Sequence, residues 1–224
     1  MTGYYSKKLA GDRLRACYEL ASPRVKAYLE AEIAFVLERT SPSLVAAELG
    51  CGYGRILKRL TGRVKAAFGI DTSLESLQYA RTFVGGSQPV RLLLMDATEM
   101  GVADATFDLT VCIQNGICAF SVDPDRLFAE ALRVTRPGRT VLFSTYSPRF
   151  WDDRLEWFEL QAAAGLIGEI DRHATGNGVI VCKDGFRATT IDAAGFQSLA
   201  AHHNVRPRLV EVDGSSLFCE VLAP

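Results

Sequence analysis

The sequence predicts an α/β protein built on a Rossmann-like, mostly parallel sheet. Short apolar runs alternate with amphipathic stretches through residues 41–147, which is typical of successive βαβ units. A glycine-rich turn at residues 50–54 follows the first apolar run, and acidic residues follow the next two, at Asp71 and Asp96. We therefore expect glycines and carboxylates to meet at one edge of the sheet.

The order of the expected elements supports this fold class. Strands are expected at 44–48, 64–70, 90–95, 107–113 and 140–145. Helices are expected at 55–60, 73–83 and 124–134, the last with Asp123 as N-cap and Pro124 in its first turn. The segment Arg136-Pro137-Gly138-Arg139 predicts a turn before the fifth strand.

The two ends of the chain do not follow this alternation of strands and helices. Residues 7–39 show helical periodicity, and Ser22-Pro23 marks the start of a second helix. After the fifth strand we expect a helix at 152–164, hairpins within 166–190 and a helix at 192–202. Residues 207–212 and 217–222 then form an expected antiparallel pair around the turn at Asp213-Gly214.

Composition excludes several classes of protein. The chain has 224 residues, 48% hydrophobic and 23% charged, with a formal net charge of -1, so it predicts a globular protein without a strong field for nucleic acid. The six cysteines include no C-x-x-C pair, which favours reduced thiols and indicates no metal site. Because no signal peptide or long apolar run is present, we expect a cytoplasmic protein that does not enter membranes.

Polar residues at the predicted strand ends indicate a ligand site. Glu48 precedes the glycine turn, where the backbone can approach a ligand closely. Asp71, at the end of the second strand, can accept hydrogen bonds from both hydroxyls of a ribose. Asp96 ends the third strand, and Gln114-Asn115 ends the fourth. These positions together predict a nucleoside-like ligand in the crevice outside the carboxyl ends of the strands.

These landmarks, in this order, resemble the class I S-adenosylmethionine-dependent methyltransferases. The resemblance runs from Val45 to Thr145 and rests on the segments AELGCGYG, GID, LLLMDATEM, FDLTVCIQN and LRVTRPGRTVLFS. It implies a seven-stranded sheet with an antiparallel C-terminal strand and S-adenosyl-L-methionine as cofactor. The length of the chain predicts a single domain. Within it we expect four parts, namely an N-terminal helical lid (1–40), a cofactor-binding core (41–147), a substrate-side helix and β-hairpin insertion (148–190), and closing helix and strands (191–224).

The resemblance assigns roles to residues at the strand ends. Glu48, Gly50 and Gly52 are expected beside the methionine portion of the cofactor, and Asp71 at its ribose. Asp96 with Ala97 is expected at the adenine, and Gln114 with Asn115 beside the sulfonium. Cys51 and Thr72 are expected in the same cofactor site.

The acceptor is less well defined by the sequence. We expect methyl transfer to an N, O or S atom of a small molecule, with Tyr4, Tyr5, Arg149 and Trp151 as substrate-side candidates. Tyr5 and His202 are candidates for a catalytic base. The oligomeric state is not indicated by any pattern in the sequence.

Two other functions are compatible with the same motifs. An NAD-dependent oxidoreductase would share the glycine turn and Asp71, although the carboxylate of Glu48 would repel a pyrophosphate. A non-catalytic S-adenosylmethionine-binding module would share every cofactor residue. Within the family, position 113–117 lacks the Pro-Pro-aromatic motif of base-modifying enzymes, and an arsenic-type enzyme would need reactive cysteines.

Overall fold

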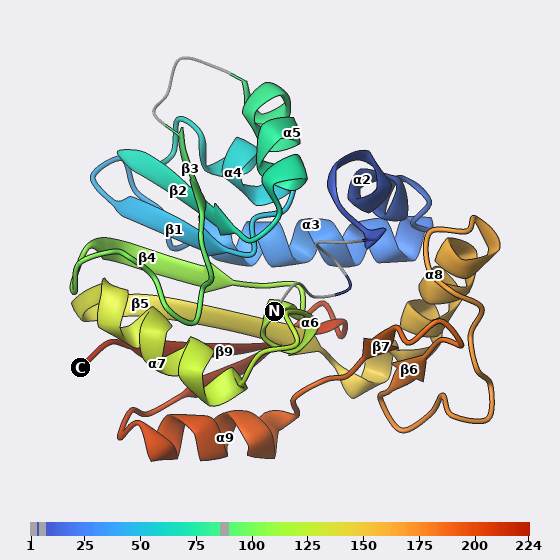
Figure 1. Ribbon diagram of the computed structural model, residues 1–224. Helices are drawn as coiled ribbons and strands as arrows, with labels where there is room; N and C mark the ends of the chain where they lie inside the picture. The colour runs from blue at the N-terminus through green and yellow to red at the C-terminus, as the bar shows by residue number, and fades with distance from the viewer. Residues whose placement is uncertain (1–3, 5–7, 86–89) are drawn as a thin grey trace.

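The centre of the molecule is a seven-stranded sheet in the order β3-β2-β1-β4-β5-β9-β8 (Figure 1). The computed structural model describes residue 4 and residues 8–85 and 90–224. Strands β1 to β5 pair in parallel, whereas β9 is antiparallel to both β5 and β8. The predicted fold class, with its antiparallel C-terminal strand, is confirmed.

Most elements lie within two residues of their predicted bounds. The strands are β1 (Val45–Leu49), β2 (Ala66–Asp71), β3 (Val90–Leu94), β4 (Phe107–Cys112), β5 (Thr135–Tyr146), β6 (Ile180–Val181), β7 (Arg187–Ala188), β8 (Arg208–Val212) and β9 (Ser216–Leu222). The helices are α2 (Gly11–Glu19), α3 (Pro23–Leu37), α4 (Arg55–Leu60), α5 (Leu74–Val84), α6 (Gly116–Ala119), α7 (Pro124–Val134), η1 (Pro148–Phe150), α8 (Trp151–Ala163) and α9 (Ala193–His202). Local capping explains the accuracy at α7, where the Asp123 side chain accepts a hydrogen bond from the backbone of Asp125.

The start of β5 differs from the prediction. The expected turn at residues 136–139 is a bulge inside a longer strand, because Phe107 pairs with Thr135 while Leu109 already pairs with Thr140. Gly138 adopts a φ of +73° there, and its N–H donates to the carbonyl of Ala223 at 2.8 Å. The backbone near the C-terminus therefore stabilises a bulge that the sequence pattern predicts as a simple turn.

Helices cover both faces of the sheet. One core contains buried side chains of α3, α4 and α5, such as Val36, Leu57 and Leu77, packed against the sheet. The opposite core contains α7 and α9, with Phe128 and Phe196. In Figure 1, α7 and α9 are accordingly drawn on the near side of the sheet, and α3 lies behind it. This is the layered arrangement of a doubly wound α/β fold.

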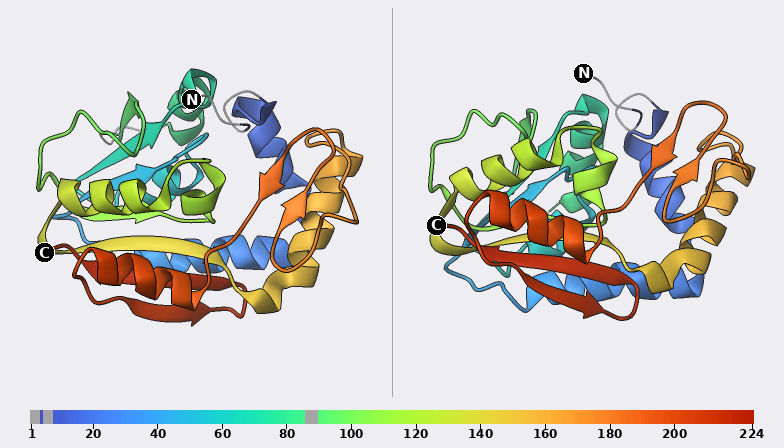
Figure 2. Two further views of the ribbon diagram at one scale, coloured as in Figure 1. Left: turned by 60° about the horizontal axis from the view of Figure 1, so that its bottom comes forward. Right: turned by 90° about the horizontal axis from the view of Figure 1, so that it is seen from below.

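A third core lies beyond the carboxyl ends of the parallel strands. It joins α2, the first turns of α3, α8 and the β6–β7 hairpin through buried side chains such as Cys17, Trp157 and Phe186. Both views in Figure 2 show α2, α8 and the hairpin grouped at this end of the sheet. Only α2 of the predicted helical lid lies here along its full length, because the second half of α3 packs on the sheet. Within the described residues, no helix has the length and apolar character needed to cross a membrane.

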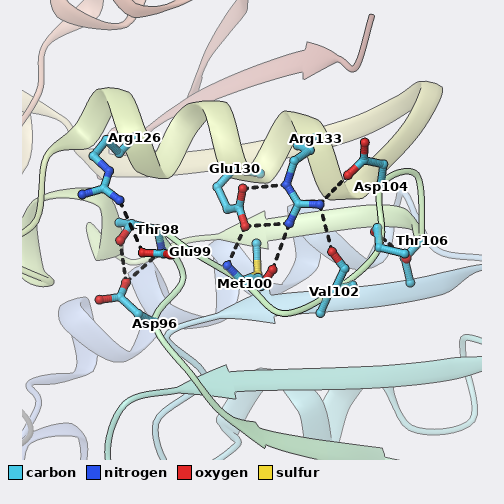
Figure 3. A network of polar contacts seen from close by, with 12 residues as sticks. Asp96, Thr98, Glu99, Met100, Val102, Asp104, Thr106, Arg126, Glu130 and Arg133 are labelled. Atoms are coloured by element: carbon cyan, nitrogen blue, oxygen red, sulfur yellow. Dashed lines mark hydrogen bonds and ion pairs between the residues drawn. The ribbon is translucent and has the colours of Figure 1, made fainter.

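The loop after β3 is tied to α7 by a polar network (Figure 3). The Arg133 guanidinium donates to the carbonyls of Met100 and Val102 and to the Glu130 carboxylate. Glu130 in turn accepts from the backbone N–H of Met100. These bonds satisfy backbone groups of an irregular segment and so fix the position of the loop that begins at Asp96.

We predict that Leu127→Ala lowers the free energy of unfolding by about 2–5 kcal/mol, because Leu127 is fully buried between α7 and the sheet. Chemical denaturation followed by circular dichroism measures this loss. Leu222→Ala is the matched control, since 58% of that side chain is exposed. The two variants having equal stability would contradict the assigned core.

Candidate functional site

The glycine turn after β1 adopts a conformation that requires glycine. Gly50, Gly52 and Gly54 have φ values of +73°, +52° and +87°. A Cβ atom added to Gly50 would lie 2.1 Å from the Phe120 ring, and one added to Gly52 would lie 2.8 Å from Leu14. Both the backbone conformation and the close neighbours therefore exclude larger residues at this turn.

Asp71 links the glycine turn to the start of α5. One oxygen of its carboxylate accepts from the N–H of Gly52 at 2.8 Å, and the other accepts from the N–H of Ser73 at 2.8 Å. Burial raises the pKa of Asp71, although these backbone donors act in the opposite direction. The carboxylate lines the cavity beside the turn, where its remaining lone pairs can accept from a ligand.

Glu48 brings a buried carboxylate to the same cavity. Its side chain is 4% exposed, and no described residue forms a hydrogen bond with its Oε2 atom. Burial raises the pKa of Glu48 to about 8, although the positive charge of Arg55 opposes this shift. A buried acceptor without a partner is costly, so this atom suits a ligand that carries a cationic donor.

Gln114 is held at the end of β4 by neighbours from two helices. Its Oε1 atom accepts from the Tyr18 hydroxyl at 2.7 Å and from the Arg55 guanidinium at 2.9 Å. Its backbone N–H donates to Ser144, whose hydroxyl donates to the fully buried Glu32. This chain of hydrogen bonds stabilises Gln114 at a φ of +55°, a conformation that is rare outside glycine.

The Asn115 side chain is used for structure. Its Oδ1 atom accepts from the Thr145 hydroxyl at 2.8 Å, and its Nδ2 donates to the carbonyl of Thr189 at 2.9 Å. These bonds join the end of β4 to β5 and to the segment after the hairpin. Asn115 lines the cavity, but its amide already has protein partners.

Asp96 lines the cavity just after the carboxyl end of β3. One carboxylate oxygen accepts from both the N–H and the hydroxyl of Thr98, at 2.8 and 2.7 Å. The backbone bond from Thr98 is the main reason why the pKa of Asp96 lies below its usual range. The second oxygen of this exposed carboxylate is available to a ligand.

A single cavity collects all the residues expected at the cofactor site. Those ten residues are Glu48, Gly50, Cys51, Gly52, Asp71, Thr72, Asp96, Ala97, Gln114 and Asn115. They come from the carboxyl ends of four neighbouring parallel strands, as the order β3-β2-β1-β4 requires.

The candidates for the acceptor side lie elsewhere. The Tyr4 hydroxyl donates to Asp184 in a shallow depression outside the cavity. Arg149 is 76% exposed and pairs with Glu211, while Trp151 packs at the edge of the third core. His202 is exposed at the end of α9, and Tyr5 lies outside the described residues. The position of these four described side chains does not support a role in the cavity.

Further side chains that line the cavity come mainly from α2, α8 and the β6–β7 hairpin. They are Leu9, Leu14, Cys17, Tyr18, Tyr146, Trp157, Phe158, Gln161, Arg187 and Ala188. Three of the elements that carry them, α2, α8 and the β6–β7 hairpin, are far apart in sequence and meet only in the third core. Helical periodicity marks Tyr18 as a residue that faces inward, but no pattern in the sequence separates Arg187 from an ordinary exposed arginine.

Comparison with known proteins agrees with this geometry. A family model for a methyltransferase domain matches residues 47–143. The chain is 32% identical over 102 residues to a putative methyltransferase, YqeM, of Bacillus subtilis, covering 45% of this chain and 41% of that protein. It is 28% identical over 190 residues to an arsenite methyltransferase of Aquipseudomonas alcaligenes, covering 79% of this chain and 48% of that protein. The chain thus spans less than half the length of these curated relatives.

A solved structure shows the same fold over almost the whole chain. A SAM-dependent methyltransferase from Aquifex aeolicus aligns with a TM-score of 0.62 and 16% identity, covering 94% of this chain and 98% of that one. At this identity the likeness establishes the fold alone.

We predict that Gly50→Ala destabilises the protein less when Phe120 is also replaced by alanine. The Phe120 ring occupies the space that the new methyl group needs, so Phe120→Ala removes the clash but leaves the strain of a positive φ, about 1–2 kcal/mol. A double-mutant cycle by chemical denaturation measures the coupling. Strictly additive losses would show that the two residues are not in contact.

Proposed function

Because this chain belongs to the class I S-adenosylmethionine-dependent methyltransferases, we propose that it transfers a methyl group from S-adenosylmethionine to an N, O or S atom of a small organic molecule. S-adenosylmethionine is the cofactor of this family, and its sulfonium supplies an electrophilic methyl carbon. The protein therefore needs no covalent nucleophile. Its main contribution is to hold two molecules in line and to exclude water.

The observation that carries this proposal is the set of charges gathered in the cavity. The unpartnered oxygen of Glu48 and the guanidinium of Arg55 suit the ammonium and carboxylate of a methionine portion. Asp71 lies at the next strand end, where it can accept from ribose hydroxyls. The glycine turn leaves room for backbone contact with the same ligand. The chemistry of these side chains supports the cofactor as the ligand of this cavity.

The acceptor is proposed to have an apolar body and an anionic end. Tyr18, Trp157 and Phe158 supply aromatic surface in the half of the cavity beside the cofactor residues. Arg187, an exposed residue, lines the same cavity, and its guanidinium has no hydrogen bond or ion pair with any described residue. A planar guanidinium of this kind suits a carboxylate or phosphate on the acceptor.

The Tyr146 hydroxyl is proposed to orient the acceptor rather than to deprotonate it. The side chain lines the cavity and is 7% exposed. Burial raises the pKa of Tyr146 to about 12, so its hydroxyl keeps its proton at neutral pH. It can therefore donate a hydrogen bond to an acceptor atom.

Arsenite is a poor candidate for the acceptor. Two cysteines, Cys17 and Cys51, line the cavity, and a thiophilic ligand would need them as thiolates. Burial raises the pKa of Cys17 to about 12 and raises the pKa of Cys51 well above its ordinary value. Both thiols therefore stay protonated, which favours a carbon-based acceptor over the substrate of the arsenite methyltransferase relative.

The alternative functions make different demands on the site. A dinucleotide would bring a pyrophosphate to the glycine turn. The carboxylate of Glu48 lines the cavity there and would repel this anion. A non-catalytic cofactor-binding module is compatible with the same cavity. Turnover is the property that separates it from an enzyme.

The proposed function is tested by incubating the purified protein with S-adenosylmethionine labelled in its methyl group and a pool of small metabolites. We expect the label to move into one or a few products that mass spectrometry identifies, with carboxylates or phosphates among them. Asp71→Ala, which removes the ribose acceptor, should reduce cofactor affinity by about 1–3 kcal/mol. Tight cofactor binding without labelled product from any pool would favour the non-catalytic module.

We predict that cofactor affinity rises with pH between 6 and 7.5. The ionised form of Glu48 binds the ammonium, and with a pKa of about 8 that form is lost as pH falls, so affinity drops by up to tenfold for each pH unit. Isothermal titration calorimetry measures this slope. Glu48→Gln should bind about tenfold more weakly at pH 7.5 and show a flat pH profile. Parallel slopes for the two proteins would assign the pH dependence to another group.

We predict that Arg187→Gln raises the KM for the acceptor about tenfold while the Kd for S-adenosylmethionine stays unchanged, because one charge-assisted contact to the acceptor is lost. The acceptor identified in the labelling screen is used. Arg149→Gln is the matched control, because Arg149 is an exposed arginine outside the cavity. If Arg187→Gln instead weakened the binding of S-adenosylmethionine, the guanidinium would be assigned to the cofactor and not to the acceptor.

A further inference from the structure

We propose that His202, His203 and Asp125 form a binding site for a divalent transition-metal ion such as Zn²⁺, separate from the cavity. The Oδ1 atom of Asp125 lies 2.8 Å from Nδ1 of His202 and 2.9 Å from Nε2 of His203. All three donor atoms lie within 4.8 Å of one another. None of the three residues lines the cavity described above.

The donor set matches the chemistry of Zn²⁺. Imidazole nitrogen and carboxylate oxygen bind this ion at about 2.0–2.2 Å, so tetrahedral ligands stand about 3.3 Å apart. The two oxygen-to-nitrogen distances here are shorter by roughly half an ångström, as expected when a proton rather than a metal ion bridges each pair. One divalent cation could replace both hydrogen bonds after a small outward movement of the rings. Water would complete its coordination.

Packing holds two of the three ligands in place. The His203 ring stacks on Phe128 with 5.4 Å between centroids, and Phe128 stacks on Phe143 in the core. Asp125 lies in the first turn of α7, where its backbone N–H donates to Asp123. The His202 side chain is 71% exposed and can adjust to the ion. The site is thus largely formed before any metal binds, which lowers the cost of binding.

Nearby cations do not compete for the carboxylate. Arg126 follows Asp125 in α7, but its guanidinium pairs with Glu99 at 3.7 Å (Figure 3). Among described residues, only the side chains of His202 and His203 bond to the Asp125 carboxylate. The carboxylate charge therefore remains available to balance a bound cation.

A metal ion at this site would link the start of α7 to the end of α9. Asp125 belongs to the start of α7, and the histidines end α9, which packs in the same core on one face of the sheet. Binding to the folded state alone stabilises a protein by mass action. We therefore expect the ion to raise the melting temperature and to leave methyl transfer unchanged.

Titration of the metal-free protein with Zn²⁺ and with Co²⁺ tests the proposal. Calorimetry should show one saturable site, and Zn²⁺ should raise the melting temperature in a way that a chelator reverses. The visible spectrum of bound Co²⁺ should report nitrogen and oxygen ligands. His202→Ala and Asp125→Asn should each weaken binding about tenfold or more.

The chain offers a matched control, because its third histidine, His173, lies in the insertion away from this cluster. His173→Ala should bind Zn²⁺ like the unmodified protein. Three results would overturn the proposal, namely no saturable binding, equal binding by the His202→Ala variant, or a cobalt–thiolate charge-transfer band that moves the ion to cysteine. Metal affinity is measured without cofactor, so these outcomes do not depend on the proposed methyl transfer.

Discussion

The two hydrogen bonds that the Asp71 carboxylate accepts organise the ligand cavity. By accepting from Gly52 and Ser73 at once, it ties the turn after β1 to the start of α5. The glycines give that turn its left-handed conformation, and without a fixed anchor they would also make it flexible. A charged acceptor with two backbone donors supplies the anchor. The same carboxylate thus shapes the site and remains available to a ligand in it.

Polar side chains at the other strand ends are also held by hydrogen bonds within the protein. Gln114 receives bonds from α2 and α4, and Asn115 connects β4 with β5 and the segment after the hairpin. Buried Glu32 lies at the base of this network through Ser144. Polar groups that are hydrogen-bonded within the protein define a rigid rim. The groups left without a protein partner, above all Glu48, then determine which ligand charges are accommodated.

The sequence was most informative where structure is decided locally. The bounds of α7 follow from Asp123 and Pro124, and the strand ends follow from apolar runs that stop at acidic residues. The bulge in β5 was not predictable, because its Gly138 is stabilised by backbone from the far end of the chain. Arg187 was missed for a related reason. Only the docking of the hairpin against α2 and α8 brings it to the cavity.

Two side chains predicted on the acceptor side, Arg149 and Trp151, do not line the cavity. Arg149 and Trp151 follow β5 directly, so proximity in sequence suggested proximity to the ligand. The chain instead continues into η1 and α8, which carry these two side chains to the surface and to the edge of the third core. The inner face of α8, with Trp157 and Phe158, reaches the cavity about two turns later.

The separation of the third core from the two cores of the sheet has an evolutionary consequence. Residues on the proposed acceptor side of the cavity belong mainly to α2, α8 and the hairpin, while the residues proposed for the cofactor lie at the strand ends of the sheet. Selection can therefore remodel one half of the molecule while the other is conserved. A lineage that inherits this scaffold is free to acquire new substrates without having to reinvent its methyl donor.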